Sequence, residues 1–489
     1  MEILTKADGL ILIFGYFIAM LGIIALLKKR ENTKEEFLVA GRSASWIMTA
    51  FSMAATWVWA PSMFTAAEKA YTQGLAGVFW FVVPNVLTLI LFAFFAKKMR
   101  GLRPNGWTFS DYIRVKYSNR AHNMYLIESF GLQTCSMAVQ LLAGATIFHK
   151  ITGLPFFWTT VMLATVPLVY SVMHGIRGNI VSDFVKMGFI VVVLLMGLPI
   201  MISNAGFDTF LNGLGGISGN FGSLFDSNGI AVMLSFGIPT TIGLLSGTFG
   251  DQMFWQRVFC VKQDKVKRTM ITAAFIFAVV PVSLASFGFF ASGAGLAIAD
   301  TQLVNVGAVI AFTPKWFLYL FFLLILSGLI STVDSILCAV SSIAGHDVQM
   351  RIAGAGKPGS LTAIRIGGRL LNSVDLARIS MFVITALAIC IANIPGITIT
   401  YLFLFYGTLR SSVMLPTIFA IKGWRMSERG LYYGIMASLV IGLPIFAYGN
   451  LHNNIPLILT GSILTICTSG IMARTMKDKP TTDRNMNLY

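Results

Sequence analysis

Residues 327–342 read SGLISTVDSILCAVSS, within a stretch that is otherwise as apolar as a membrane helix. They include five serines, a threonine and an aspartate. Four residues recur at i, i+3, i+4 and i+7 of a helix with about 3.6 residues per turn and so share one face: Gly328, Ser331, Thr332 and Ser335. Asp334 lies about 100° around the helix. The pattern predicts a face that a partner backbone can approach closely and whose neutral oxygens suit a hard monovalent cation.

This face also has a plainer interpretation. Membrane serines and threonines commonly hydrogen-bond to a carbonyl of their own helix or join two helices, and small residues on one stripe form a packing face. Asp334 is harder to explain in this way, since a carboxylate at membrane depth costs at least a few kcal/mol and is usually paired or functional.

The whole chain has the composition of an all-α integral membrane protein. Its 489 residues are 56% hydrophobic and 11% charged. Apolar runs long enough to cross a bilayer core of about 30 Å recur from end to end. They predict thirteen spans: roughly 9–27, 45–66, 75–97, 121–149, 156–174, 179–202, 230–250, 269–292, 315–345, 376–394, 397–421, 430–449 and 455–473.

The formal net charge of +16 is distributed as a topology signal. Every second loop between the predicted spans is basic, and the long 203–229 segment has no Lys or Arg. This pattern predicts the N-terminus outside and the C-terminus inside, in a multi-pass protein of the cell membrane. The basic residues therefore do not indicate a nucleic-acid partner. The connections hold at most about 30 residues, too few for an appended soluble domain, so kinase, sensor and hydrolase functions are excluded and no enzyme is expected.

Two of the predicted spans contain interruptions typical of transporter binding sites. The second span contains Pro61, and the seventh contains Gly237 and Pro239. Each begins a set of five spans, and the two sets have opposite orientations, as in the 5+5 inverted repeats of secondary transporters with broken first helices. The chain is therefore divided into five segments: an N-terminal accessory helix and loop at 1–44, the first repeat at 45–202, an external loop at 203–228, the second repeat at 229–421, and two accessory helices with a tail at 422–489.

Several stretches of sequence resemble the sodium:solute symporter family. GLISTVDSILCAVSSIAGHD is similar to the family's hydroxyl-rich sodium helix, GIRGNIVSDFVKM to its glycine-rich turn followed by a hydroxyl–Asp pair, and FLVAGRSASWIMTAFSMAATW to the entry into its first core helix; they span residues 328–347, 175–187 and 37–57. DQMFWQR, residues 251–257, is a weaker match. The resemblance implies the inverted-repeat fold also seen in the bacterial leucine transporter.

The resemblance also implies a site for sodium, as a coupling ion rather than a tightly held cofactor. Carbonyls of the broken first helix would face a small residue and two hydroxyls of the ninth span, at Ala55, Val58, Gly328, Ser331 and Thr332. Asp183 matches an acidic position on the family's ion exit path, where we also place Asp334. Trp57 departs from the family, in which an acidic or small polar residue is common. Lys186, where relatives often carry glutamine, either pairs with Asp183 or extends to the inner surface.

Amide, hydroxyl and indole groups near the interruptions suit a small, polar, neutral or zwitterionic solute. The candidate solute residues are Trp57, Trp59, Ser62, Trp80, Phe81, Gln133, Gln140, Thr240, Tyr401 and Tyr406. Aromatic belts at the membrane surface are the alternative explanation for the tryptophans and tyrosines. Arg410 could instead balance a solute carboxylate, and we expect Glu68 and Lys69 to form a surface pair. The segments AATWVWAP and GVFWF resemble the branch of the family that contains urea transporters.

These observations predict a sodium-coupled symporter that imports a small polar solute, urea-like or otherwise neutral or zwitterionic, across the lipid bilayer by alternating access. A proton-coupled carrier of the same fold, with Asp334 or Asp183 as the titrating group, is an alternative. A passive solute channel and a membrane receptor are less favoured. The oligomeric state stays open.

Overall fold

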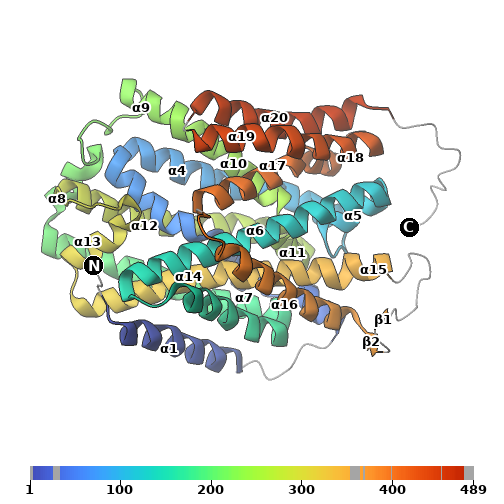
Figure 1. Ribbon diagram of the computed structural model, residues 1–489, viewed down its shortest axis with the longest axis horizontal. Coiled ribbons are helices and arrows are strands. Elements are labelled where there is room, and N and C mark those ends of the chain that lie inside the picture. Colours follow the sequence, from blue (N-terminus) through green and yellow to red (C-terminus); the bar gives the residue numbers. More distant parts are fainter. Residues whose placement is uncertain are drawn as a thin grey trace, which may run out of the picture.

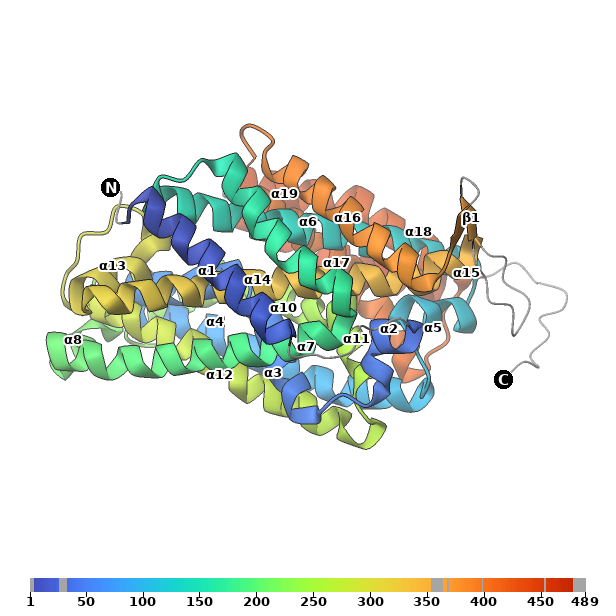
Figure 2. The ribbon, with the colours of Figure 1, turned by 90° about the horizontal axis from the view of Figure 1, so that it is seen from below.

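The computed structural model describes residues 4–25, 33–352, 364–366, 369–397, 399–452 and 454–477. Most of these residues belong to helices that run roughly along the long axis of the molecule (Figures 1 and 2). A short antiparallel hairpin pairs Ile364–Ile366 (β1) with Arg369–Leu371 (β2). The α-helices are α1 (Lys6–Ala25), α2 (Lys34–Val39), α3 (Trp46–Trp57), α4 (Ala60–Leu102), α5 (Phe109–Lys116), α6 (Asn119–Thr152), α7 (Phe156–Ala205), α8 (Phe207–Asn212), α9 (Ser227–Val232), α10 (Ile238–Gly250), α11 (Gln252–Cys260), α12 (Val266–Gly293), α13 (Val304–Phe312), α14 (Lys315–Ser342), α15 (Gln349–Ile352), α16 (Ser373–Ala392), α17 (Ile399–Lys422), α18 (Glu428–Ala437), α19 (Leu443–Leu451) and α20 (Ile455–Thr475).

Ten helical segments among the described residues are long and apolar enough to cross a membrane, against thirteen predicted. The numbers differ because two segments each contain parts of two predicted spans, and because α17 is not among the ten. α4 changes direction at Gln73 and Gly74, and α7 at Gly175. Gly175 has φ +54°, and a Cβ there would collide with Phe37 O, so the kink in α7 requires a glycine.

The first core helix is broken where the sequence indicates. α3 ends at Trp57, Val58 and Trp59 have non-helical dihedrals, and α4 begins with Pro61 in its first turn. Proline suits the first turn of a helix because its missing N–H would have no partner there. The break leaves main-chain carbonyls without partners inside their own helix.

The break in the second repeat lies further along the chain than predicted. Gly237 ends a π-turn, Met233–Gly237, and Pro239 stands in the first turn of α10, so the helix continues past both residues. The prediction of an interruption at Gly237 and Pro239 is therefore wrong in position, because the wider π-turn accommodates the proline. The helix instead breaks at Asp251, which is extended (φ −110°, ψ 122°) and caps α11.

Helix α14 lies at the centre of the bundle. Residues 324–347, which include its polar face, are all buried. α14 packs against α7 and α6, and against α3 on the side of the first break; Figure 2 shows α14 and α7 side by side. The hydroxyl-bearing face is thus surrounded by protein.

Candidate functional site

The break in the first core helix faces the hydroxyls of α14. Ser331 Oγ donates to Ala55 O at 3.1 Å, and Thr332 Oγ1 donates to Val58 O at 3.2 Å. Both hydroxyls also contact Gly328 O, at 2.9 Å and 3.4 Å. The structure therefore brings together all five residues proposed to bind sodium, which we call the carbonyl–hydroxyl site.

Gly328 permits this close approach. A Cβ at Gly328 would collide with Met63 Sδ and would lie 3.4 Å from Val58 Cγ1. The site consists of neutral oxygens, and no cluster of three or more His, Cys, Asp or Glu among the described residues could hold a metal ion. Neutral oxygen ligands suit a hard monovalent cation that must bind and then leave, so the donor set fits sodium.

A buried network of charges adjoins the carbonyl–hydroxyl site. Arg257, on α11, donates from Nη2 to Asp183 Oδ2 at 3.0 Å and to Ser335 Oγ at 2.7 Å. Ser335, one turn beyond Ser331 on α14, also shares a hydrogen bond of 2.9 Å with Thr56 Oγ1. The network thus touches both helices that form the carbonyl–hydroxyl site. Arg257 lies in the weakly matching 251–257 stretch, but the sequence analysis did not identify it as a site residue. Its partners Asp183 and Ser335 are 74 and 78 positions away, so the neighbouring sequence does not indicate them.

Lys186 lies between the two carboxylates that were assigned to the ion exit path. Its Nζ is 3.3 Å from Asp183 Oδ1 and also donates to Asp334 Oδ2. Since the Lys186 side chain is only 1% exposed, it forms the predicted pair and does not extend to the surface. Asp334 accepts further hydrogen bonds from Tyr170 and, at 2.6 Å, from Asn179 Nδ2. The negative charges of Asp183 and Asp334 are therefore balanced in the interior by the positive charges of Lys186 and Arg257.

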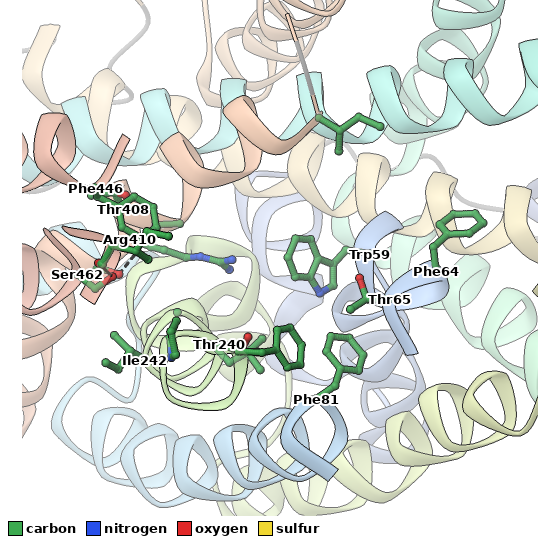
Figure 3. Close-up of a pocket in the computed structure, with 18 of the residues that line it drawn as sticks. Trp59, Phe64, Thr65, Phe81, Thr240, Ile242, Thr408, Arg410, Phe446 and Ser462 are labelled. Carbon is green, nitrogen blue, oxygen red and sulfur yellow. Dashed lines mark hydrogen bonds between the residues drawn. The ribbon is translucent and has the colours of Figure 1, made fainter. Parts of the chain in front are cut away.

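A cavity of about 360 Å³ opens beside the same break (Figure 3). Three predicted solute residues line it: Trp59, Phe81 and Thr240. The sequence analysis missed other lining residues, among them Phe64, Thr65, Phe236, Thr408, Ser411, Phe446, Ser462 and Thr465. The last three belong to α19 and α20, within the segment 422–489 for which the sequence predicts two accessory helices.

Arg410 supplies a cation to this cavity. Figure 3 shows its side chain extending from α17 toward Trp59. The guanidinium Cζ lies 3.9 Å from the ring centroid of Tyr406 and 5.6 Å from that of Trp59. Arg410 is 2% exposed and takes part in no ion pair formed by the described residues. Arg410 is one of the residues that line the cavity, and its Nε has no hydrogen-bond partner in the described part of the chain.

Glu68 and Lys69 do not form the expected surface pair. Within the described part of the chain no ion pair joins them. Glu68 lines the cavity, whereas Lys69 Nζ lies 4.5 Å from the ring centroid of Phe236.

Six other candidate solute residues, all with described side chains, are not among the residues that line the cavity. Trp57 packs against Phe254, Ser62 Oγ donates to Trp59 O, and Gln133 Nε2 donates to Asp251 Oδ1 at 2.8 Å. Trp80 packs on Gly237, Gln140 is buried, and the ring centroid of Tyr406 lies 6.1 Å from that of Trp59, with the rings tilted by 52°. The side chain of Tyr401 lies outside the described residues.

The amino-acid sequence of this chain is similar to those of several known transporters. The chain is 21% identical over 516 residues to the urea-proton symporter DUR3 of Oryza sativa subsp. japonica, covering 96% of this chain and 70% of that protein. It is 25% identical over 200 residues to the urea active transporter of Saccharomyces cerevisiae, covering 40% of this chain and 27% of that protein. It is 24% identical over 196 residues to the sodium/pantothenate symporter of Escherichia coli, covering 38% of this chain and 40% of that protein.

The fold matches that of a solved Na⁺-coupled sialic acid symporter, with a TM-score of 0.72 over 95% of this chain and 97% of that one, at 17% identity. The sequence model of the sodium:solute symporter family matches residues 37–438. The family and these relatives are transporters, so this chain is a multi-pass membrane transporter of small solutes and not an enzyme. It belongs to the sodium:solute symporter family.

Proposed function

We propose that this protein is a sodium-coupled symporter that imports a small polar solute by alternating access. One observation carries the proposal: consecutive residues of the broken helix serve two sites. Val58 O accepts the hydrogen bond from Thr332 in the carbonyl–hydroxyl site, and the next residue, Trp59, lines the cavity. An ion that orders this segment reduces the ordering cost of solute binding, and by linkage the solute favours the ion to the same degree.

The cavity supports a neutral or zwitterionic solute with a planar polar group. Its lining includes five aromatic side chains, Trp59, Phe64, Phe81, Phe236 and Phe446, and the hydroxyl-bearing residues Thr240, Thr408 and Ser411. Arg410 adds donors for a carbonyl or carboxylate oxygen. Urea and related amides are the first solutes to test, because the rice relative that matches over 96% of this chain is named a urea-proton symporter and the yeast relative, which matches over 40%, a urea active transporter.

The test is uptake into proteoliposomes. We expect an inward sodium gradient to concentrate labelled urea, or another member of a panel of amides and amino acids, above its outside concentration. Replacing sodium by potassium or dissipating its gradient with an ionophore removes the concentration step. Saturable uptake without concentration under any gradient would contradict symport. Concentration driven by a pH gradient but indifferent to sodium would favour the second candidate, a proton-coupled carrier. The name of the rice relative, a urea-proton symporter, supports this candidate.

A further inference from the structure

Two buried carboxyl groups take no part in the ion pairs described above. Glu128 on α6 is 1% exposed and Asp251, at the break before α11, is fully buried. Neither forms an ion pair with any described residue. This differs from Asp183 and Asp334, which Arg257 and Lys186 neutralise. Buried carboxylates are costly unless they are paired, protonated or bound to a cation.

The oxygen atoms of this pair are incompletely satisfied. Asp251 Oδ1 accepts from Gln133 Nε2 at 2.8 Å and from Met253 N at 2.9 Å, but Asp251 Oδ2 has no donor. Ser129 Oγ donates to Glu128 Oε2 at 3.3 Å, and Glu128 Oε1 has no donor.

The side chain of Gln133 gives a separate indication of a ligand. It is fully buried and is directed at Asp251, and its Oε1 also has no donor. Three buried acceptor atoms on Asp251, Glu128 and Gln133 thus have no hydrogen-bond donor among the described residues. The bond from Gln133 joins Asp251 to α6, the helix that carries Glu128.

The pair is adjacent to the proposed solute cavity. A Cβ on Gly250, the residue before Asp251, would lie 2.7 Å from Arg410 Cβ. The charges of Asp251 and Arg410 both act on Glu128. The other charged or titratable groups that act on the pair are Tyr125 on α6, Arg257 on α11 and Tyr406 on α17. If Arg410 is charged and both carboxylates are ionised, these three groups sum to −1. One added proton makes them neutral.

We propose that Glu128 and Asp251 bind one exchangeable proton, and that this proton is taken up and released during the solute cycle. The proton comes from water, forms an O–H bond with an unsatisfied carboxylate oxygen, and returns to water on the other side. Arg410, which contacts the segment before Asp251 and lines the cavity, couples the charge of the pair to the solute. This assignment replaces Asp183 and Asp334 as the titrating groups, and its coupling role rests on the proposed symporter function.

The first experiment detects the proton without any solute. Infrared spectra of the reconstituted protein are compared with those of Glu128→Gln and Asp251→Asn over a range from acid to alkaline pH. We expect a protonated-carboxyl band that titrates with pH and is lost or shifted in both variants. Glutamine keeps the size of Glu128, and asparagine keeps the N-cap of α11. Asp208→Asn, which removes an exposed carboxylate on α8, leaves the band unchanged. If neither substitution of the pair alters a protonated-carboxyl band, the site does not exist.

The second experiment tests coupling in proteoliposomes, using the solute that the panel identifies. An inward proton gradient should increase uptake in the unmodified protein and in Asp208→Asn. Glu128→Gln should lose this increase. If sodium drives uptake but the pH gradient has no effect, the coupling proposal is wrong while the symporter proposal stands. If no gradient drives concentrative uptake, the proposed function fails, and the infrared result still decides whether the pair binds a proton.

Discussion

At the scale of single residues, the hydroxyls of Ser331 and Thr332 each make one contact within their own helix and one with a neighbouring segment. One contact returns to Gly328 O on their own helix, as membrane hydroxyls commonly do. The other reaches α3 or the break that follows it. The second contact makes these hydroxyls candidates for ion binding, because an ion there would connect two helices.

We expect Ser331→Ala and Thr332→Ala each to raise the sodium concentration for half-maximal uptake by about fivefold, since each removes one oxygen ligand worth roughly 1 kcal/mol. Ser341→Ala is the matched control. Ser341 is also buried on α14, but its hydroxyl donates only to Cys338 O. Sodium titration of uptake measures the effect. An unchanged sodium requirement in both variants, at normal expression, would remove the carbonyl–hydroxyl site from the mechanism.

The glycine at position 328 allows a second prediction. Gly328→Ala places a methyl group against Met63, so we expect a loss of about 1–3 kcal/mol in unfolding free energy together with weaker sodium dependence. Gly188→Ala on α7 is the control, since a Cβ there meets no atom within 4 Å. Denaturation in mixed micelles and sodium-dependent uptake report the two effects. Equal unfolding free energy and equal sodium dependence in the two variants would show that Met63 does not pack tightly against Gly328.

At the scale of elements, α7 and α14 are joined by opposite charges buried between them. Lys186→Met leaves Asp334 without a cation, and we expect it to cost about 3–5 kcal/mol in unfolding free energy. Adding Asp334→Asn should recover part of that loss, because the unpaired charge is removed as well. Lys150→Met breaks an exposed pair with Asp300 and should cost less than about 1 kcal/mol. Chemical denaturation compares the unmodified protein with Lys186→Met, Asp334→Asn, their double variant and Lys150→Met. Additive effects of the two buried substitutions would contradict a direct pair.

Helix α2 carries a pH-dependent lysine outside the predicted spans. Burial lowers the pKa of Lys34 from 10.5 to about 8, against the opposing effect of the negative charges of Asp347 and Asp111. Between these two values the unfolded chain binds more protons than the folded one, so this lysine makes stability rise as pH increases through that window. We expect Lys34→Met to reduce this rise in thermal stability, and exposed Lys262→Met to leave it unchanged. Identical pH profiles for Lys34→Met and the unmodified protein would contradict the burial of this amine.

At the scale of the whole molecule, the cavity draws its walls from both repeats and from the last two helices. Thr65 on α4, Thr240 on α10 and Ser462 on α20 all line it. A relative movement of these helices would therefore change access to the cavity, as alternating access requires.

Labelling at Thr65 tests that movement. We expect a membrane-impermeant thiol reagent to modify Thr65→Cys at a rate that sodium alters and that sodium with solute reduces several-fold. The unmodified protein sets the background from its native cysteines, of which Cys390 is exposed. Labelling at one constant rate under all conditions would argue against a change of access at this position.

Local sequence determined much of the architecture. Hydrophobic length and charge placement indicated a helical membrane protein, Pro61 indicated the first break, and the spacing from Gly328 to Ser335 indicated the buried polar face. These signals act within a few turns of helix and can be read without knowledge of the packing. Gly237 and Pro239 predicted a break at the wrong position because the local sequence does not show the π-turn before Pro239. A π-turn accommodates a proline that a regular helix would not.

Tertiary structure alone decided which groups meet. The sequence by itself, through its resemblance to a family, suggested Ala55 and Ser331 as partners, but these residues are 276 positions apart and only helix packing brings their oxygens together. Packing also placed Lys186 between two acids, left Glu128 and Asp251 without cations, and made α19 and α20 walls of the cavity. Such contacts depend on how separate helices are rotated and spaced against one another, and a local pattern carries no information about either.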